Sequence, residues 1–276
     1  MTRRGDTVAG TYSIAAMTET IPPIPTTPTT QPARRVRGKR QDDLGRAFAG
    51  SQMCLQVWVN RRQADFSRRL LRALGITDSD ARVEWKSPLE GRLPTKKAFK
   101  EYKDGAFLAQ LELDAHRSEL ANFWPAGGPV WDGLAVVRRS EMPDLFVLIE
   151  AKSYPGEVLG SGCVATPNSE RKIKCALDET ATWLGVARPE SWMKALYQSA
   201  NRIAHVYFLR QKLGLDGVMV NVCFTNDESI GRPTSVEAWE SAKRQFRESL
   251  ELEGVATPWL VDLVLEAPRR EELLRD

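Results

Sequence analysis

Two runs composed mainly of apolar residues constrain the fold of this chain more than any other feature. Residues 145–151 read LFVLIEA and residues 217–224 read GVMVNVCF, each about the length of one strand. Runs that are apolar at consecutive positions, rather than at alternate ones, are typical of strands covered on both faces of a sheet. We therefore expect an α/β fold, in which helices pack on both faces of a mixed central sheet.

The rest of the chain alternates between strand-like and helical patterns. A polar turn separates 145–151 from an earlier strand at 130–137, which predicts a hairpin. Apolar residues at helical spacing, with Gly and Pro at the breaks, predict the remaining elements. We expect helices at 42–74, 95–113, 114–123, 169–184, 190–212 and 235–252, strand material around Val83, and a last strand at 259–265.

Composition divides the chain into three parts. Residues 1–41 are rich in Thr and Pro and hold seven basic and two acidic residues, so we expect a disordered tail of net charge +5. Residues 42–125 are expected to form a helical region packing on the core, and 126–276 the α/β core itself. Because the whole chain carries +3, residues 42–276 carry −2. Nucleic acid would therefore have to bind through a local patch together with the tail.

Composition and the sequence patterns that the chain lacks disfavour several classes of protein. A chain of 276 residues with 42% hydrophobic content can bury a large core. It has no apolar stretch near the roughly 20 residues of a membrane helix and no secretory signal pattern, so we expect a cytoplasmic protein without a membrane partner. The four cysteines and two histidines are scattered, which disfavours zinc sites and disulfides and predicts buried, reduced thiols.

Charged residues lie in the two strands that are expected to form the hairpin, 130–137 and 145–151. Glu150 lies near the end of the second strand and Lys152 directly after it, and their spacing of two places them on one side of the sheet. The hairpin would bring Asp132 to a similar level on the neighbouring strand. Carboxylates are hard ligands that suit Mg²⁺ or Mn²⁺, the carbonyl of Ala151 is a further candidate ligand, and an amine beside them can position water. The alternative is an ordinary ion pair between Glu150 and Lys152 at a strand end.

This arrangement resembles the PD-(D/E)XK nuclease superfamily. Asp132, an interval of 17 residues, and then Glu150-Ala151-Lys152 after an apolar strand follow its pattern, although Trp131 stands where the superfamily usually has proline. The resemblance implies a restriction-endonuclease-like α/β/α core, a divalent metal between Asp132 and Glu150, and Lys152 beside the attacking water. Longer phrases resemble a group of bacterial proteins within that superfamily, which has no established substrate: FWP at 123–125, GPVWD at 128–132, IEAK at 149–152 and YQSANR at 197–202.

Further candidates lie on helices. Gln198, Arg202 and His205 share one face of the helix at 190–212, where an ordinary solvent face would be rich in Glu and Lys. In the superfamily this helix packs beside the active site, so we expect Gln198 and Arg202 to assist there, with helix-to-loop hydrogen bonding as the alternative. His205 is expected to be a packing residue. Glu119 is the best candidate for an additional acid near the metal, and Glu101 competes with it.

These observations lead to two hypotheses. The first is a Mg²⁺- or Mn²⁺-dependent nuclease that hydrolyses phosphodiester bonds in nucleic acid, DNA ahead of RNA. Asp132 and Glu150 would bind the metal, Lys152 would orient the nucleophile, and Gln198 and Arg202 would assist. The second is a catalytically inactive module of the same fold that binds nucleic acid or a protein partner. Neither the oligomeric state nor the preferred sequence of a substrate follows from the chain.

Overall fold

A computed structural model describes residues 40–91, 98–160, 162–231 and 233–275. The expected tail at 1–41 and the start of the helix expected at 95–113 lie almost wholly outside these residues. In chain order the strands are β1 (Arg82–Ser87), β2 (Gly133–Arg138), β3 (Leu145–Lys152), β4 (Asp216–Thr225) and β5 (Leu260–Glu266). The α-helices are α1 (Gly50–Asn60), α2 (Gln63–Ala73), α3 (Gly105–Gln110), α4 (Arg117–Phe123), α5 (Pro167–Leu184), α6 (Tyr197–Tyr207), α7 (Val236–Ser249) and α8 (Arg270–Leu273).

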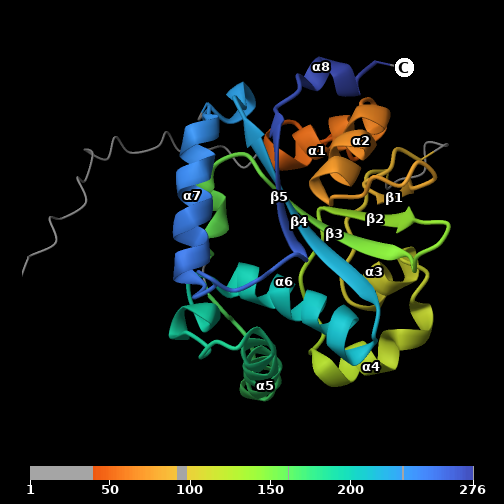
Figure 1. The fold of residues 1–276 in the computed structure, drawn as a ribbon. Coiled ribbons are helices and arrows are strands. Elements are labelled where there is room, and N and C mark those ends of the chain that lie inside the picture. The colour runs from red at the N-terminus through yellow and green to blue at the C-terminus, as the bar shows by residue number, and fades with distance from the viewer. Residues whose placement is uncertain (1–39, 92–97, 161, 232, 276) are drawn as a thin grey trace, which may run out of the picture. The chain divides into compact units, whose positions relative to one another are not determined.

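The five strands form one sheet in the order β1-β2-β3-β4-β5. The pairs β1–β2 and β2–β3 are antiparallel, whereas β3–β4 and β4–β5 are parallel, so the expected mixed sheet of an α/β fold is confirmed. The two apolar runs are β3 and β4, which lie in the interior of the sheet (Figure 1). Their side chains are apolar at consecutive positions because each strand is covered on both faces.

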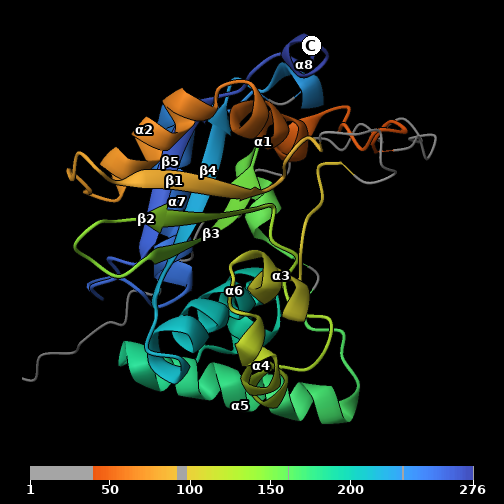
Figure 2. The same ribbon diagram turned by 90° about the vertical axis from the view of Figure 1, so that its right-hand side faces the viewer.

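Alternate residues of β3 belong to two separate cores. Val147 and Ile149 pack into the core that includes α1 and α2. Phe146 and Leu148 pack into the other core, with residues of α3 to α6. Figure 2 shows α1 and α2 on one side of the sheet and α3, α4, α5 and α6 on the other. The consequence for the candidate site is that Glu150 and Lys152 continue the face of Phe146 and Leu148.

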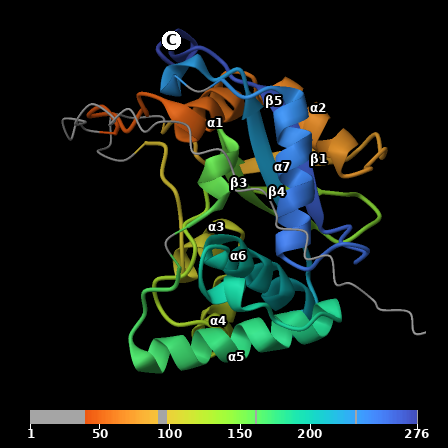
Figure 3. The ribbon, with the colours of Figure 1, turned by 90° about the vertical axis from the view of Figure 1, so that its left-hand side faces the viewer.

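Helix α7 runs beside β4 and β5 (Figure 3). Its Ser235 N-cap accepts a hydrogen bond from the backbone N–H of Ala238, and the indole N–H of Trp239 donates to the carbonyl of Phe224 at 2.9 Å. Trp239 is 1% exposed and therefore fixes α7 to the end of β4.

The central sheet crosses the boundary expected at 125/126. Strand β1 lies within 42–125 and pairs with β2, and the described residues from Arg40 to Arg275 belong to one compact unit. Residues 42–125 therefore contribute an edge strand as well as helices. Two of the four cysteines, Cys54 and Cys223, are buried, whereas Cys175 is exposed, so the expectation of buried thiols holds only in part. Among the helices of the described segments, none is long and apolar enough to cross a membrane.

Candidate functional site

The ends of β2 and β3 bring the three charged residues of the sequence motif together. Gly133 pairs with Ile149, so Asp132 and Glu150 follow at the same end of the hairpin. The Asp132 carboxylate accepts a hydrogen bond from the backbone N–H of Ala151 at 2.8 Å, which joins the two strands beyond their last ladder pair. Asp132, Glu150 and Lys152 therefore share one corner of the sheet.

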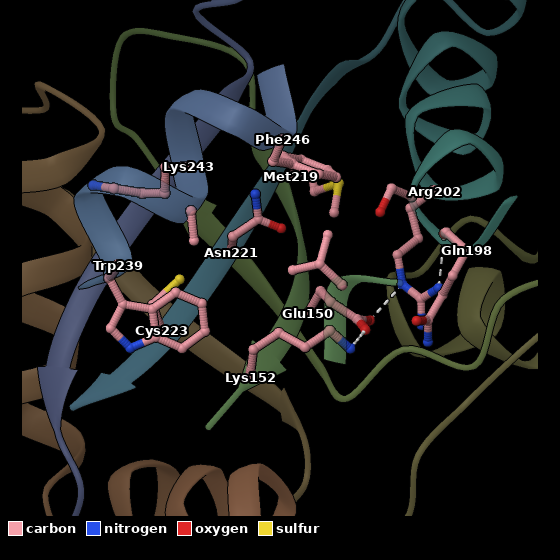
Figure 4. Close-up of a pocket in the computed structure, with 13 residues that line it drawn as sticks. Glu150, Lys152, Gln198, Arg202, Met219, Asn221, Cys223, Trp239, Lys243 and Phe246 are labelled. Atoms are coloured by element: carbon pink, nitrogen blue, oxygen red, sulfur yellow. Dashed lines mark hydrogen bonds and ion pairs between the residues drawn. The ribbon is translucent and has the colours of Figure 1, made fainter. Parts of the chain in front are cut away.

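Glu150 lies between two cations. The Lys152 ammonium donates a hydrogen bond to Oε1 of Glu150, and the Arg202 guanidinium forms an ion pair with Oε2 that lacks hydrogen-bond geometry (Figure 4). Glu150 and Arg202 are 4% and 5% exposed, so this ion pair lies in the interior. A buried carboxylate is stable only where such partners compensate its lost hydration.

Arg202 connects α6 to both motif strands. Besides Glu150, its guanidinium donates to the carbonyl of Gln198 at 2.9 Å and to the carbonyl of Val130 at 3.2 Å. It also lies 5.8 Å from the ring centroid of Trp131. The segment that leads into Asp132 is thus bound to the residue that holds Glu150.

The carboxyl of Asp132 has a strongly altered acidity. Burial, and then the negative charge of Glu150, raise the pKa of Asp132 to about 8, against the opposing effect of Lys152. Glu101 raises it further. A carboxyl that remains protonated near neutral pH beside another carboxylate is a group that a bound cation would deprotonate.

Of the two upstream acids, the structure brings Glu101 to the site. Tyr102 pairs with Trp131, whose backbone N–H donates to the carbonyl of Tyr102 at 2.9 Å, and this register places Glu101 level with Asp132. The amide of Gln52 on α1 donates to Glu101 at 2.6 Å. Burial raises the pKa of Glu101, and the charge of Glu150 adds to the increase.

Glu119 has a different environment. It lies exposed on α4, where its carboxylate accepts from the hydroxyl of Ser118 at 2.8 Å and lies 3.3 Å from Nδ1 of His116. These two contacts lower the pKa of Glu119, and Ser118 has the larger effect. The structure therefore gives Glu119 local partners on its own helix and in the turn before it, and no contact with Asp132 or Glu150 is found among the described residues.

The polar face expected on the helix at 190–212 divides into two environments. Gln198 and Arg202 line the space beside Glu150 (Figure 4). His205 is 1% exposed, packs against aromatic rings including Trp124, and has Nδ1 at 2.7 Å from the carbonyl of Asn201. Burial lowers the pKa of His205 to about 4, so the ring is neutral at physiological pH, as suits a packing residue.

Asp227, which the sequence did not single out, helps to fix the chain directly after Lys152. The Ser153 hydroxyl donates to Asp227 at 2.5 Å, and its backbone N–H donates to Glu157 at 2.9 Å. Asp227 is 1% exposed and also accepts from the backbone N–H of Ser229 at 3.0 Å. Because Asp227 follows β4 and Ser153 follows β3, only the parallel pairing of these strands reveals the connection.

A small cavity lies behind Glu150, between the sheet and helices α6 and α7 (Figure 4). Its volume is about 30 Å³, room for roughly two water molecules. Met219, Asn221, Trp239 and Phe246 are among the residues that line it together with Glu150. The cavity is too small for a nucleotide, so it belongs to the packing behind the site.

The donor atoms present suit a hard divalent cation, but they do not form a complete cage. Within residues 40–91, 98–160, 162–231 and 233–275, no group of three or more His, Cys, Asp or Glu side chains is arranged to hold a metal ion. Asp132 and Glu150 supply two carboxylates. The carbonyl of Ala151 faces the same edge of β3 as its N–H, which reaches Asp132. These three oxygen donors match the preference of Mg²⁺ and Mn²⁺, with water completing the shell.

Comparisons with known proteins give no independent assignment. We found no family model, no curated protein and no solved structure that matches this chain.

Proposed function

We propose that this chain is a Mg²⁺- or Mn²⁺-dependent nuclease with a restriction-endonuclease-like α/β/α core. Its preferred substrate would be DNA over RNA. The observation that carries the proposal is the convergence of Asp132, Glu150 and Lys152 at one corner of the sheet. A sheet covered by helices on both faces, with the acidic corner at the carboxyl end of an interior strand, is compatible with that core.

Each residue has a role that follows from its position. Asp132 and Glu150 would hold the cation, which polarises a phosphoryl oxygen and lowers the pKa of a bound water. Lys152 would orient the attacking water and neutralise the charge that develops on the phosphate. Gln198, which lines the small space beside Glu150, would bind water through its amide.

Cleavage assays with two variants test the proposal. Single- and double-stranded DNA and RNA are incubated with wild type, Asp132→Asn and Lys152→Met, with Mg²⁺, Mn²⁺ or EDTA. We expect metal-dependent cleavage by wild type and a loss of at least about 100-fold in each variant. Asp216→Asn is the matched control, because Asp216 pairs with Arg139 and Arg210 at the opposite end of β4. It should cleave within about twofold of wild type.

One observation favours a second candidate, the catalytically inactive module. Both carboxylate oxygens of Glu150 already contact protein cations, so the corner is electrostatically compensated without a metal. If no substrate is cleaved with either metal, while nucleic acid or a protein still binds, the inactive module replaces the nuclease. Equal cleavage by wild type, Asp132→Asn and Lys152→Met would identify a contaminating enzyme.

A further inference from the structure

The two cations on Glu150 are held very differently. Arg202 has two neutral anchors besides Glu150, the carbonyls of Gln198 and Val130, and its side chain is 6% exposed. Lys152 makes its ion pair with Glu150 alone within the described part of the chain, and its side chain is 14% exposed. Arg202 is therefore held in place by the backbone around it, whereas the Lys152 side chain can leave Glu150 without breaking another ion pair among the described residues.

From this asymmetry we infer that Arg202 is a positioning residue that permanently occupies Oε2 of Glu150, whereas Lys152 holds Oε1 only until a divalent cation takes that oxygen. The inference rests on the proposed function. It assigns Glu150 a single metal-binding oxygen, and it gives the two cations opposite effects on metal affinity.

The argument for Arg202 is geometric. Its contacts with Val130, two residues before Asp132, and with Glu150 tie the two candidate ligands to one rigid group on α6. Groups that orient a metal ligand, here through a buried ion pair, raise metal affinity because the free ligand then has fewer alternative rotamers. Without the guanidinium, Glu150 would lose its fixed orientation.

The argument for Lys152 is electrostatic. An ammonium on Oε1 repels a divalent cation that approaches the same carboxylate, so the ion pair must open before the metal binds. Once displaced, the long and flexible side chain remains close enough to reach a phosphate or a water. Besides Arg202, the titratable groups that face this carboxylate from other elements are the carboxyls of Asp132 and Glu101, and neither carries a positive charge that would oppose the incoming cation.

Calorimetric titration with Mn²⁺, without substrate, measures the predicted effects separately from catalysis. For Arg202→Met we expect an affinity at least about tenfold weaker than wild type, with partial recovery in Arg202→Lys. For Lys152→Met we expect an affinity at least about threefold tighter. Arg210→Met is the matched control, because Arg210 is paired with Asp216 away from this corner, and it should bind Mn²⁺ as wild type does.

The outcomes separate this inference from the proposed function. If wild type binds Mn²⁺ and both Arg202→Met and Lys152→Met weaken binding, or both strengthen it, the division of roles is wrong while the nuclease proposal stands. If wild type does not bind Mn²⁺ at any pH between 7 and 9, the metal site itself is refuted. Thermal melts accompany each titration, and should Arg202→Met not fold, the opposite signs expected for Arg202→Lys and Lys152→Met still decide the question.

Discussion

At the scale of single residues, the acidic corner costs the folded protein stability. The folded-state pKa of Asp132, about 8, lies far above the ordinary value of 3.8. Between these two pH values the folded state binds a proton that the unfolded chain releases. Stability therefore falls as pH rises through this window, and the full cost is present above pH 8.

Replacement of Asp132 by Asn should remove that cost. The amide oxygen can still accept from the N–H of Ala151, but it carries no charge. We expect Asp132→Asn to be more stable than wild type by about 2 kcal/mol or more at pH 9, and the difference to shrink toward pH 4. Urea unfolding of both proteins at several pH values, with EDTA present, measures this difference. A constant difference across the range would show that Asp132 titrates normally.

His205 should lower the stability of the folded protein as pH falls, the opposite pH dependence to that of Asp132. Its folded-state pKa is about 4, against 6.5 for an ordinary histidine, so the unfolded chain binds a proton that the buried ring does not. The resulting loss of stability begins below pH 6.5 and reaches roughly 3 kcal/mol near pH 4. His205→Gln should lose less stability than wild type between pH 7 and 4 in urea titrations. Parallel losses in the two proteins would contradict this.

The residues of the candidate site were predictable to different degrees. Spacing along one strand was enough to place Glu150 and Lys152 on the same face, and the hairpin placed Asp132 beside them. Helical periodicity grouped Gln198, Arg202 and His205 but could not tell which of them faces the sheet. The register of Tyr102 with Trp131, which brings Glu101 rather than Glu119 to Asp132, depends on a tertiary contact with no local signal.

At the scale of elements, the strands were predicted closely, whereas three long helices were wrong in extent. Of the helix expected at 95–113, the described residues contain only the short α3. The helix expected at 42–74 is two helices, and Asn60 at the break bonds to the carbonyl of Pro88 at 2.8 Å. The helix expected at 190–212 contains only α6 and short flanking turns. There the carbonyls of Met193 and Ala195 accept from Cys163 and Gly160 of a distant loop instead of continuing a helix. Periodicity does not reveal such competing acceptors.

The contact between β4 and the end of α6 gives a prediction for an element. A Cβ added at Gly217 would lie 2.9 Å from Cβ of Leu209, in the π-helical turn η4 (Phe208–Lys212). Gly217→Ala should therefore destabilise the protein by about 1–3 kcal/mol in urea unfolding. In a Leu209→Gly background the same change should cost little, because the clashing Cβ and the atoms beyond it are removed. An equal penalty in both backgrounds would exclude this clash as the cause.

At the scale of the whole molecule, charge is distributed unevenly along the chain. Residues 34–40 contain Arg34, Arg35, Arg37, Lys39 and Arg40, whereas 42–276 carry −2. If the protein binds nucleic acid as proposed, replacing these five residues by Gln in the full chain should reduce the slope of log affinity against log salt by up to about four. Affinity for Mn²⁺ should not change. Salt titration by fluorescence anisotropy measures the slope, and an unchanged slope would assign phosphate binding to the core alone.

The architecture of the sheet could be predicted only in part from the sequence. The alternation of strands and helices predicted the layered architecture, because it reflects the burial of each segment. The place of β1 at the edge of the same sheet was not predicted, since its pairing with β2 joins segments about 50 residues apart.

The pairing of β2 with β3 has a consequence for folding itself. Side chains alternate between faces, so a hairpin misaligned by one residue would move Glu150 and Lys152 into the apolar layer beneath α1 and α2. It would also separate Asp132 from the N–H of Ala151. Two unsatisfied charges in that layer would make a shift by one residue, or by any odd number, unfavourable. The charged residues at this corner therefore favour the native register of β2 with β3, independently of any reaction that the site performs.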